Sequence, residues 1–530
     1  MPLWRWTWSL QHLRGKQMTT ILIETLHHHA KSHPKRVAFH IGEDIWTYQR
    51  LADEVERLAR GLVERGLRKG NRVALHMANV PELAVAYYAC FQIGAIAAPL
   101  NVRLKFAELR PLLQRLRPAL YIGQADLYRR VAAIDCSIVP SNTRFIVGGM
   151  VDDPWAQALT RLLEDGDAAP VRAEPDAHAP AVLLTTSGTT GQPKFVTHTQ
   201  ATLAVSADSA RQLGLDDDHI AATALPIVHG FGLFTFLACL RFGAPIVLLE
   251  RFDPDAVLDA IERHRCTWLP AVPAMFAALV ECQRARGRNV CSLQVCLSSG
   301  DVCPPRLQEQ FPALFGTPLR SFWSATEAAG SLTYGLESGP VSRIVKGAEV
   351  RLIDGSGAPV PRAEVGELAL RGPNVTIGYW AGPGLIEDAP KDGWFRTGDL
   401  MRQDDADDLW FVSRKKDVII RGGLNISPAE IERVLTAHPA VRDAVVVGVP
   451  DPALGQRVAG FVQMERGTGG IILKEILVGV TALLADYKIP ESLEMVDEIP
   501  RNTLGKMDRQ SLLAMISKPE GYDADRVARI

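Results

Sequence analysis

Short apolar strands alternate with amphipathic helices from Val37 onward, and this alternation narrows the folds open to the chain. A helix predicted over Leu51–Arg65 gathers its apolar residues near one face, and strand Arg72–Met77, helix Pro81–Phe91 and strand Ala95–Ala98 follow it. Strands that are apolar throughout are typical of a parallel sheet whose two faces are covered by helices. We therefore predict an α/β fold with a doubly wound sheet in the first part of the chain.

The chain of 530 residues is longer than one hydrophobic core usually organises, and its length predicts about three domains or subdomains. A second α/β region contains the apolar runs Trp268–Pro270 and Val295–Ser298, whereas short strands and turns after Gly347 indicate a mainly β subdomain. A smaller α+β unit begins near Asp417. We predict an N-terminal extension over 1–17 that is expected to be disordered, a large domain over 18–415 and a small C-terminal domain over 416–530.

Charge and composition exclude several classes of protein. Lys and Arg number 58 against 60 Asp and Glu, so the formal net charge of −2 leaves no basic footprint for nucleic acid. The apolar stretch 83–100 is interrupted by Gln92, Gly94 and Pro99, which predicts a buried helix and a strand rather than a transmembrane segment. Eight cysteines without a CxxC pair are typical of reduced thiols, so we expect a cytoplasmic protein.

The strongest chemical signal is the run TTSGTTGQPK over 185–194, which follows an apolar strand predicted at Ala181–Thr185. Glycines allow the backbone to turn tightly, and the hydroxyl groups, loop N–H groups and Lys194 can bind phosphate oxygens. Phe195 follows the lysine where a Walker A loop carries Ser or Thr, so the run is not a Walker loop. The predicted phosphate-binding residues are Thr186, Ser187, Gly188, Thr189, Thr190, Gly191 and Lys194.

With this loop and further motifs in the expected order, the chain resembles the adenylate-forming superfamily. That superfamily includes acyl-CoA synthetases, peptide-synthetase adenylation domains and luciferases, and this chain is most similar in style to bacterial fatty- or aryl-acid CoA ligases. The resemblance runs from about Thr20 to Leu512. The other motifs that carry it are Leu225–His229, Trp323–Glu327, Phe395–Asp399, Ser413–Asp417, Tyr487–Pro490 and Asn502–Lys506.

The resemblance implies a particular architecture. The large N-terminal domain should hold two doubly wound α/β subdomains and a β subdomain, and a small mobile α+β domain should follow. In the family this small domain swings between two half-reactions. The motif match makes Lys416 the expected hinge residue.

The resemblance also implies roles for individual residues. Glu327 is expected to bind Mg²⁺, for which a carboxylate is a suitable hard oxygen ligand, and Thr326 is expected to donate to a phosphate or carboxylate oxygen. Lys506 should neutralise the attacking carboxylate and the α-phosphate, and His229 should lie at the entrance to the acyl channel. The other expected nucleotide contacts are Ser299, Gly300, Asp301, Phe322, Trp323, which replaces the usual Tyr, Asp399 for the ribose, and Arg414.

The predicted function is ATP-dependent ligation of a carboxylic acid to a thiol through an acyl-AMP intermediate, with ATP, Mg²⁺ and CoA as cofactors. The run His229–Phe234 lacks the Asp that amino-acid-activating relatives use to pair an α-ammonium group. Because a buried ammonium without a counter-ion is costly, we expect an acid without an α-amine. Fatty and aryl acids both remain open. The alternatives are an acyl-AMP ligase that loads an acyl or peptidyl carrier protein and, disfavoured by the missing Asp, an amino-acid adenylation enzyme.

Overall fold

The structure is a computed structural model of the chain. It describes residues 21–149, 151–164, 176–186, 193–301, 303–334, 343–344, 347–421, 424–451, 454–465, 473–481, 483–502, 507–516 and 527–529. The predicted extension over 1–17 lies outside the described residues. Within them, every helix is too short or too polar to span a membrane.

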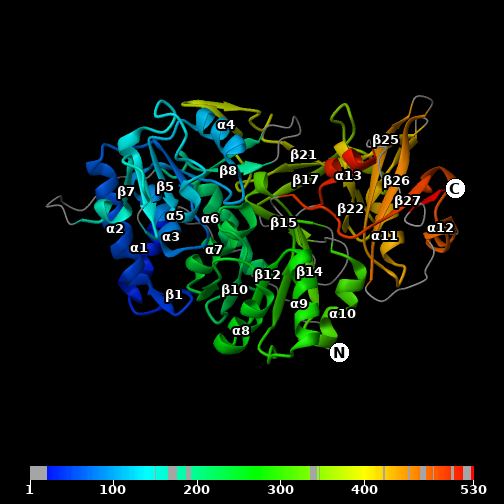
Figure 1. Cartoon of the computed structure of the whole chain (residues 1–530), viewed down its shortest axis with the longest axis horizontal. Helices are drawn as coiled ribbons and strands as arrows, with labels where there is room; N and C mark the ends of the chain where they lie inside the picture. Colours follow the sequence, from blue (N-terminus) through cyan, green and yellow to red (C-terminus); the bar gives the residue numbers. More distant parts are fainter. Residues whose placement is uncertain are drawn as a thin grey trace, which may run out of the picture.

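The first of two large sheets forms the N-terminal α/β subdomain (Figure 1). Its central strands are parallel, and antiparallel strands complete one edge. In spatial order the strands are β20 (Leu385–Glu387), β19 (Tyr379–Gly382), β9 (Lys194–Thr199), β8 (Pro180–Thr186), β4 (Ile96–Pro99), β3 (Arg72–His76), β5 (Leu120–Gln124), β6 (Arg144–Val147) and β7 (Ala156–Ala158).

The second sheet also has a parallel centre and antiparallel edges. Its N-terminal hairpin pairs with a single strand about two hundred residues later in the chain, and Phe39 of the hairpin lies opposite Ile246. In spatial order the strands are β16 (Arg343–Ile344), β15 (Gly330–Tyr334), β14 (Leu319–Ala325), β13 (Val295–Ser298), β12 (Trp268–Ala271), β10 (Ala221–Thr223), β11 (Ile246–Leu248), β1 (Val37–Ile41) and β2 (Asp44–Thr47).

Helices cover both sheets and pack between them. The residues Leu83–Ile93 of one helix are all buried, which explains why this segment is apolar on every side, and Gly94 ends the helix at φ 68°. One continuous core joins this helix to strands of both sheets. The helices are α1 (Leu22–Ser32), α2 (Tyr48–Glu64), α3 (Pro81–Ile93), α4 (Phe106–Leu116), α5 (Ala125–Tyr128), α6 (Gln200–Ser209), α7 (Gly230–Phe242), α8 (Pro254–His264), α9 (Pro273–Ala285) and α10 (Pro305–Phe315).

A four-stranded antiparallel sheet follows. It agrees with the short strands that were predicted after Gly347. Its core includes Trp323 from the second sheet, which fixes the β subdomain against that sheet. The four strands are β17 (Glu349–Ile353), β18 (Val365–Arg371), β21 (Phe395–Gln403) and β22 (Leu409–Arg414).

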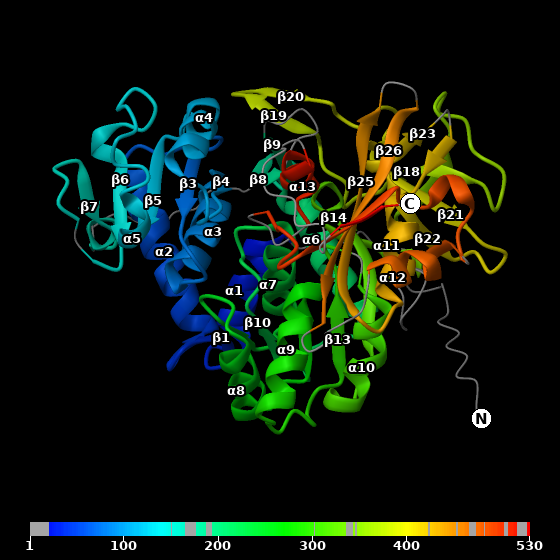
Figure 2. The ribbon, with the colours of Figure 1, turned by 45° about the vertical axis from the view of Figure 1, so that its right-hand side comes forward.

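The C-terminal domain is a mixed sheet with helices, and it lies beside the β subdomain at one end of the molecule (Figure 2). The family fold is thereby confirmed: a large domain of two α/β subdomains and a β subdomain, then a small α+β domain. The elements are β23 (Ile419–Arg421), β24 (Leu424–Ile426), α11 (Pro428–Thr436), β25 (Val441–Asp451), β26 (Gly455–Met464), α12 (Leu473–Thr481), β27 (Ser492–Val496), α13 (Arg509–Ile516) and β28 (Val527–Arg529).

Candidate active site

A cavity of about 1200 Å³ opens where the two α/β subdomains, the β subdomain and a segment of the C-terminal domain meet. Residues 498–502, which lead toward Lys506, line one side of it. Lys506 itself, and Ser187, Gly188, Thr189, Thr190 and Gly191 of the phosphate loop, lie outside the described residues. The predicted site residues that line the cavity are Thr186, Lys194, His229, Gly300, Thr326, Glu327, Asp399, Arg414 and Lys416.

The short 3₁₀ turn Thr326–Ala328, which carries the predicted phosphate contact and metal ligand, is held through its backbone carbonyls. His198 Nε2 donates to the Thr326 carbonyl at 2.7 Å, and the Thr376 amide donates to the Glu327 carbonyl at 2.7 Å. Asn374 Nδ2 donates to the Ala328 carbonyl at 2.9 Å. Because these donors come from β9 and from the segment before β19, the first sheet fixes the backbone of the turn.

His198 is fully buried beneath this turn, and burial lowers its pKa to about 4. Its Nδ1 lies 3.2 Å from the hydroxyl of Thr202. A neutral imidazole with its proton on Nε2 satisfies both contacts, since the carbonyl of Thr326 can only accept. The histidine therefore works as an uncharged support for the turn.

The side chain of Glu327 is held by a tyrosine that the motif analysis did not single out. Tyr379 Oη donates to Glu327 Oε1 at 3.1 Å. The Nζ of Lys194 lies 4.5 Å from the centroid of the same ring and 2.9 Å from Asp388 Oδ2. Burial and the neighbouring carboxylate raise the pKa of Tyr379, so the phenol stays protonated and donates.

Helix α7 begins beside Thr326 and places His229 at its N-terminus, half-buried at the cavity wall. A Cβ on Gly232 would lie 2.3 Å from the Pro226 carbonyl oxygen, so the first turn of the helix requires glycine there. Asn79 holds the preceding segment, accepting from the Ile227 amide at 2.8 Å and donating to the Leu225 carbonyl at 3.0 Å. Apolar side chains continue the wall beyond the histidine, namely Phe231, Phe234, Val272 and Met275.

The predicted ribose contact Asp399 is buried in the β subdomain with both carboxylate oxygens engaged. Trp323 Nε1 donates to Oδ2 at 2.8 Å, and Arg414 Nε lies 3.3 Å from Oδ1. Trp323 and Phe322 are themselves buried, and the Trp323 ring packs in the core of the β subdomain. Their expected contacts with adenine therefore stay predictions, whereas the structure gives the Trp323 indole a direct contact with Asp399.

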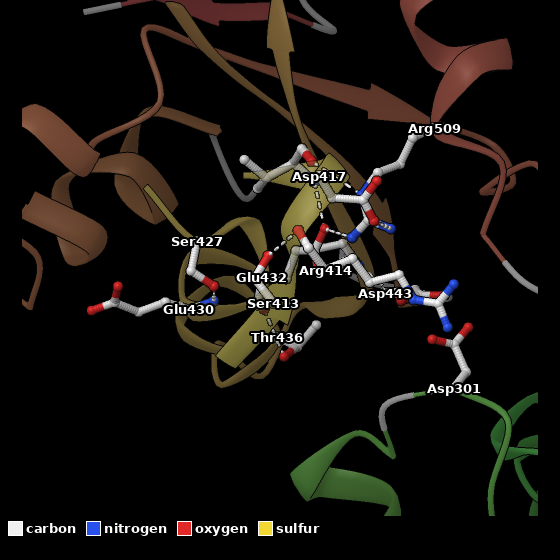
Figure 3. A network of polar contacts seen from close by, with 12 residues as sticks. Asp301, Ser413, Arg414, Asp417, Ser427, Glu430, Glu432, Thr436, Asp443 and Arg509 are labelled. Carbon is white, nitrogen blue, oxygen red and sulfur yellow. Dashed lines mark hydrogen bonds and ion pairs between the residues drawn. The ribbon is translucent and has the colours of Figure 1, made fainter. Parts of the chain in front are cut away.

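The C-terminal domain reaches the cavity through Arg501. Its guanidinium lies 2.6 Å from Asp443 within its own domain and 3.9 Å from Asp301 of the large domain. Figure 3 shows Asp301 pointing from the large domain toward the polar network that contains Asp443 and Arg509. Asp301, predicted to border the nucleotide, thus faces the domain interface. Ser299, its neighbour, lies 2.8 Å from the Ser324 hydroxyl.

The residues present fit one Mg²⁺ ion held jointly with a nucleotide. Within the described ranges no three His, Cys, Asp or Glu side chains converge to form a metal cage. Mg²⁺ commonly takes one or two carboxylates, and phosphates and water complete its coordination. Glu327, which lines the same cavity as Thr186 and Lys194 of the predicted phosphate loop, provides one such carboxylate.

The residues that sequence reasoning missed are His198, Tyr379 and Asp388. Each acts through a contact between segments that are more than fifty residues apart. No local spacing could have indicated them. The pairing of β19 with β9, which places Tyr379 opposite Val196, is what brings them to the site.

Comparison with known proteins identifies the family. Residues 26–380 match the model of the AMP-binding enzyme family, and residues 430–506 match the C-terminal domain of AMP-binding enzymes. The indoleacetate–CoA ligase of Aromatoleum aromaticum is 32% identical over 511 residues, covering 94% of this chain and 98% of the relative. A feruloyl-CoA synthase of an Amycolatopsis species is 33% identical over 487 residues, covering 90% of this chain and 95% of the relative.

A solved structure supports the same family assignment. The o-succinylbenzoate CoA synthetase of Bacillus subtilis, in complex with its acyl-adenylate intermediate, superposes with a TM-score of 0.78 at 28% identity. The match covers 92% of this chain and 97% of that chain. The resemblance predicted from the motifs is confirmed, and the chain belongs to the AMP-binding enzyme family.

Proposed function

We propose that this protein is an AMP-forming acid–CoA ligase that activates a carboxylic acid without an α-amine. The observation that supports it most is the cavity that gathers Lys194, Thr326, Glu327 and Asp399 beside the segment leading to Lys506. The matched family and the relatives of nearly full length support the same reaction type.

The reaction has two steps in this site. First the substrate carboxylate attacks the α-phosphorus of ATP, the bond to the β-phosphate oxygen breaks, and acyl-AMP and pyrophosphate form. Mg²⁺ held by Glu327, when bound, spreads the negative charge of the phosphates. Lys194 and the 186–191 loop bind the departing phosphates, Thr326 donates to an oxygen at the reacting centre, and Asp399 accepts from the ribose.

In the second step the sulfur of CoA attacks the acyl carbonyl, and the bond to the AMP phosphate oxygen breaks. The thiol proton is lost to solvent, so acyl-CoA and AMP are the products. The small domain, taken as 416–530, moves between the steps about Lys416, which lies in a 3₁₀ turn at Lys415–Asp417 on the cavity wall. This movement takes Lys506 away once the adenylate exists.

We expect the substrate to be a carboxylic acid with an apolar acyl group. The wall beyond His229 is made of Phe231, Phe234, Val272 and Met275, and the helix turn at 229–234 carries no acidic residue to pair an ammonium group. Pyrophosphate exchange measured across aryl, arylacetic, short-chain, medium-chain and long-chain acids tests the substrate class. Exchange with α-amino acids and none with apolar acids would contradict the proposal.

The acceptor and the role of Lys506 can be tested together. AMP release is measured with CoA and, separately, with a phosphopantetheinylated carrier protein, and we expect turnover with CoA. Lys506→Ala should abolish acyl-AMP formation but spare thioester formation from supplied acyl-AMP, because its charge acts in the first transition state. Equal loss of both steps would contradict that role.

A further inference from the structure

Strand β19, from a distant part of the chain, pairs with β9, the strand that begins where the phosphate-loop motif ends. Tyr379 lies opposite Val196 and Trp380 lies opposite Phe195 in antiparallel register. Figure 2 shows β19 beside β9. This pairing carries Tyr379 to the same end of the sheet as Lys194, the last residue of the phosphate-loop motif.

The backbone before Tyr379 is firmly held. Thr376 Oγ1 donates to the Thr197 carbonyl at 2.7 Å, and the Gly378 amide donates to Thr376 Oγ1 at 3.1 Å. Gly378 adopts φ +126°, and a Cβ there would lie 2.5 Å from Ile386 and 2.7 Å from the Glu387 carbonyl oxygen. The tyrosine ring is therefore presented to the cavity from a rigid strand.

The ring separates two opposite charges that the proposed reaction needs apart. The ammonium of Lys194 lies over its face, 4.5 Å from the centroid, and its hydroxyl donates to Glu327 Oε1 at 3.1 Å. Lys194 and Glu327 form no ion pair with each other, and Lys194 pairs with Asp388 instead. A direct pair would occupy both the phosphate ligand and the metal ligand.

We propose that Tyr379 is a positioning residue that fixes the Glu327 carboxylate for a divalent cation and keeps Lys194 from pairing with it. The inference rests on the proposed function of Glu327 as the Mg²⁺ ligand. The hydroxyl engages one carboxylate oxygen of Glu327, which lines the cavity, while the ring face attracts the ammonium without neutralising it.

The test uses α,β-methylene-ATP, which binds but cannot be cleaved at the α–β bridge, and measures its affinity by calorimetry in Mg²⁺ and in EDTA. The Tyr379→Phe variant keeps the ring and the packing but loses the hydroxyl. We expect its affinity in Mg²⁺ to fall about tenfold, the effect of one hydrogen bond to a charged group, and its affinity in EDTA to stay within about twofold.

Two further variants separate the two parts of the role. Tyr379→Leu also removes the ring, so Lys194 can reach Glu327 and the affinity in EDTA should fall as well. Tyr128→Phe is the matched control, because Tyr128 Oη donates to a carboxylate oxygen of Asp153 at 2.8 Å away from the cavity lining. This control should bind the analogue as the wild type does in both conditions, and thermal unfolding of every variant confirms that it is folded.

The Glu327→Gln variant distinguishes failure of the inference from failure of the function on which it rests. If Glu327→Gln keeps the Mg²⁺-dependent gain in affinity, then Glu327 is not the metal ligand. If Glu327→Gln loses that gain but Tyr379→Phe keeps it, the positioning role of Tyr379 is overturned. A fall of equal size in Mg²⁺ and in EDTA for Tyr379→Phe would also overturn it, because a merely structural defect affects both conditions.

Discussion

The buried histidine beneath the Thr326–Ala328 turn should make the large domain lose stability in mild acid. His198 is fully buried, and burial lowers its pKa from the ordinary 6.5 to about 4. Below pH 6.5 the unfolded chain binds a proton at this residue that the folded protein does not bind until about pH 4. The contribution to stability is therefore complete above pH 6.5 and is lost as the pH falls from 6.5 toward 4.

The size of the effect follows from proton linkage. Each pH unit within that window costs about 1.4 kcal/mol, so lowering the pH from 7.5 to 5.5 should cost about 1.4 kcal/mol through His198 alone. His198→Gln keeps an N–H that can donate to the Thr326 carbonyl and removes the titration. Urea unfolding followed by tryptophan fluorescence reports the large domain, because seven of the ten tryptophans lie between residues 46 and 410 and the other three lie in the N-terminal extension, so none lies in the C-terminal domain.

The comparison between the two proteins isolates this one residue. His76 is also buried with a pKa lowered to about 3, but it titrates in both proteins, so the wild type should lose about 1.4 kcal/mol more free energy of unfolding than the variant over the same interval. All other titrating groups are shared. If wild type and His198→Gln lose the same free energy between pH 7.5 and 5.5, the argument for a neutral buried imidazole is wrong.

Three further outcomes are expected. Gly232→Ala should lower the thermal unfolding midpoint and adenylation together, because its Cβ would lie 2.3 Å from the Pro226 carbonyl oxygen; Gly61→Ala, with a comparable backbone clash away from the cavity, should lower only the midpoint. Asp399→Asn should weaken ATP binding about tenfold in calorimetry, since a charged acceptor for the ribose is lost. Arg501→Met should destabilise the C-terminal domain by about 2 kcal/mol or more in calorimetric unfolding, because it leaves the buried carboxylate 2.6 Å away without its cation.

Sequence patterns predict helices and strands well where the neighbouring residues in the sequence determine the local structure. Helix α3 was predicted over Pro81–Phe91 from its apolar residues, and the structure ends it two residues later at Ile93, before the left-handed Gly94. The strand before the phosphate loop was predicted over Ala181–Thr185 and extends by one residue at each end. An apolar run that forms a strand or helix, and a glycine that ends a helix, are both signals contained within a few consecutive residues, so such predictions succeed.

The contacts that complete the site could not be predicted, because they depend on pairing between distant strands. Nothing near Tyr379 in the sequence indicates that its strand leaves the β subdomain and joins β9 of the first sheet. The expected contact of Trp323 with adenine stays a prediction, whereas the hydrogen bond from its indole N–H to Asp399, which is 76 residues away, could not be predicted from the sequence. Motifs identify which side chains gather at a site, whereas the sheet topology decides which of them touch.

The contacts between the two domains suggest why one site can serve two steps. Arg501 approaches Asp301 at 3.9 Å, and Arg306 of the large domain lies 2.9 Å from Glu465 and donates to the Pro439 carbonyl at 2.9 Å. The side chains of these ion pairs are each about a third exposed, and partly exposed pairs contribute about 0–1 kcal/mol each. A ligand that prefers one orientation by a few kcal/mol therefore outweighs these contacts. Under the proposed mechanism, conversion of ATP and acid into acyl-AMP changes which groups the cavity must neutralise, and these ion pairs would offer little resistance to the proposed movement of the small domain.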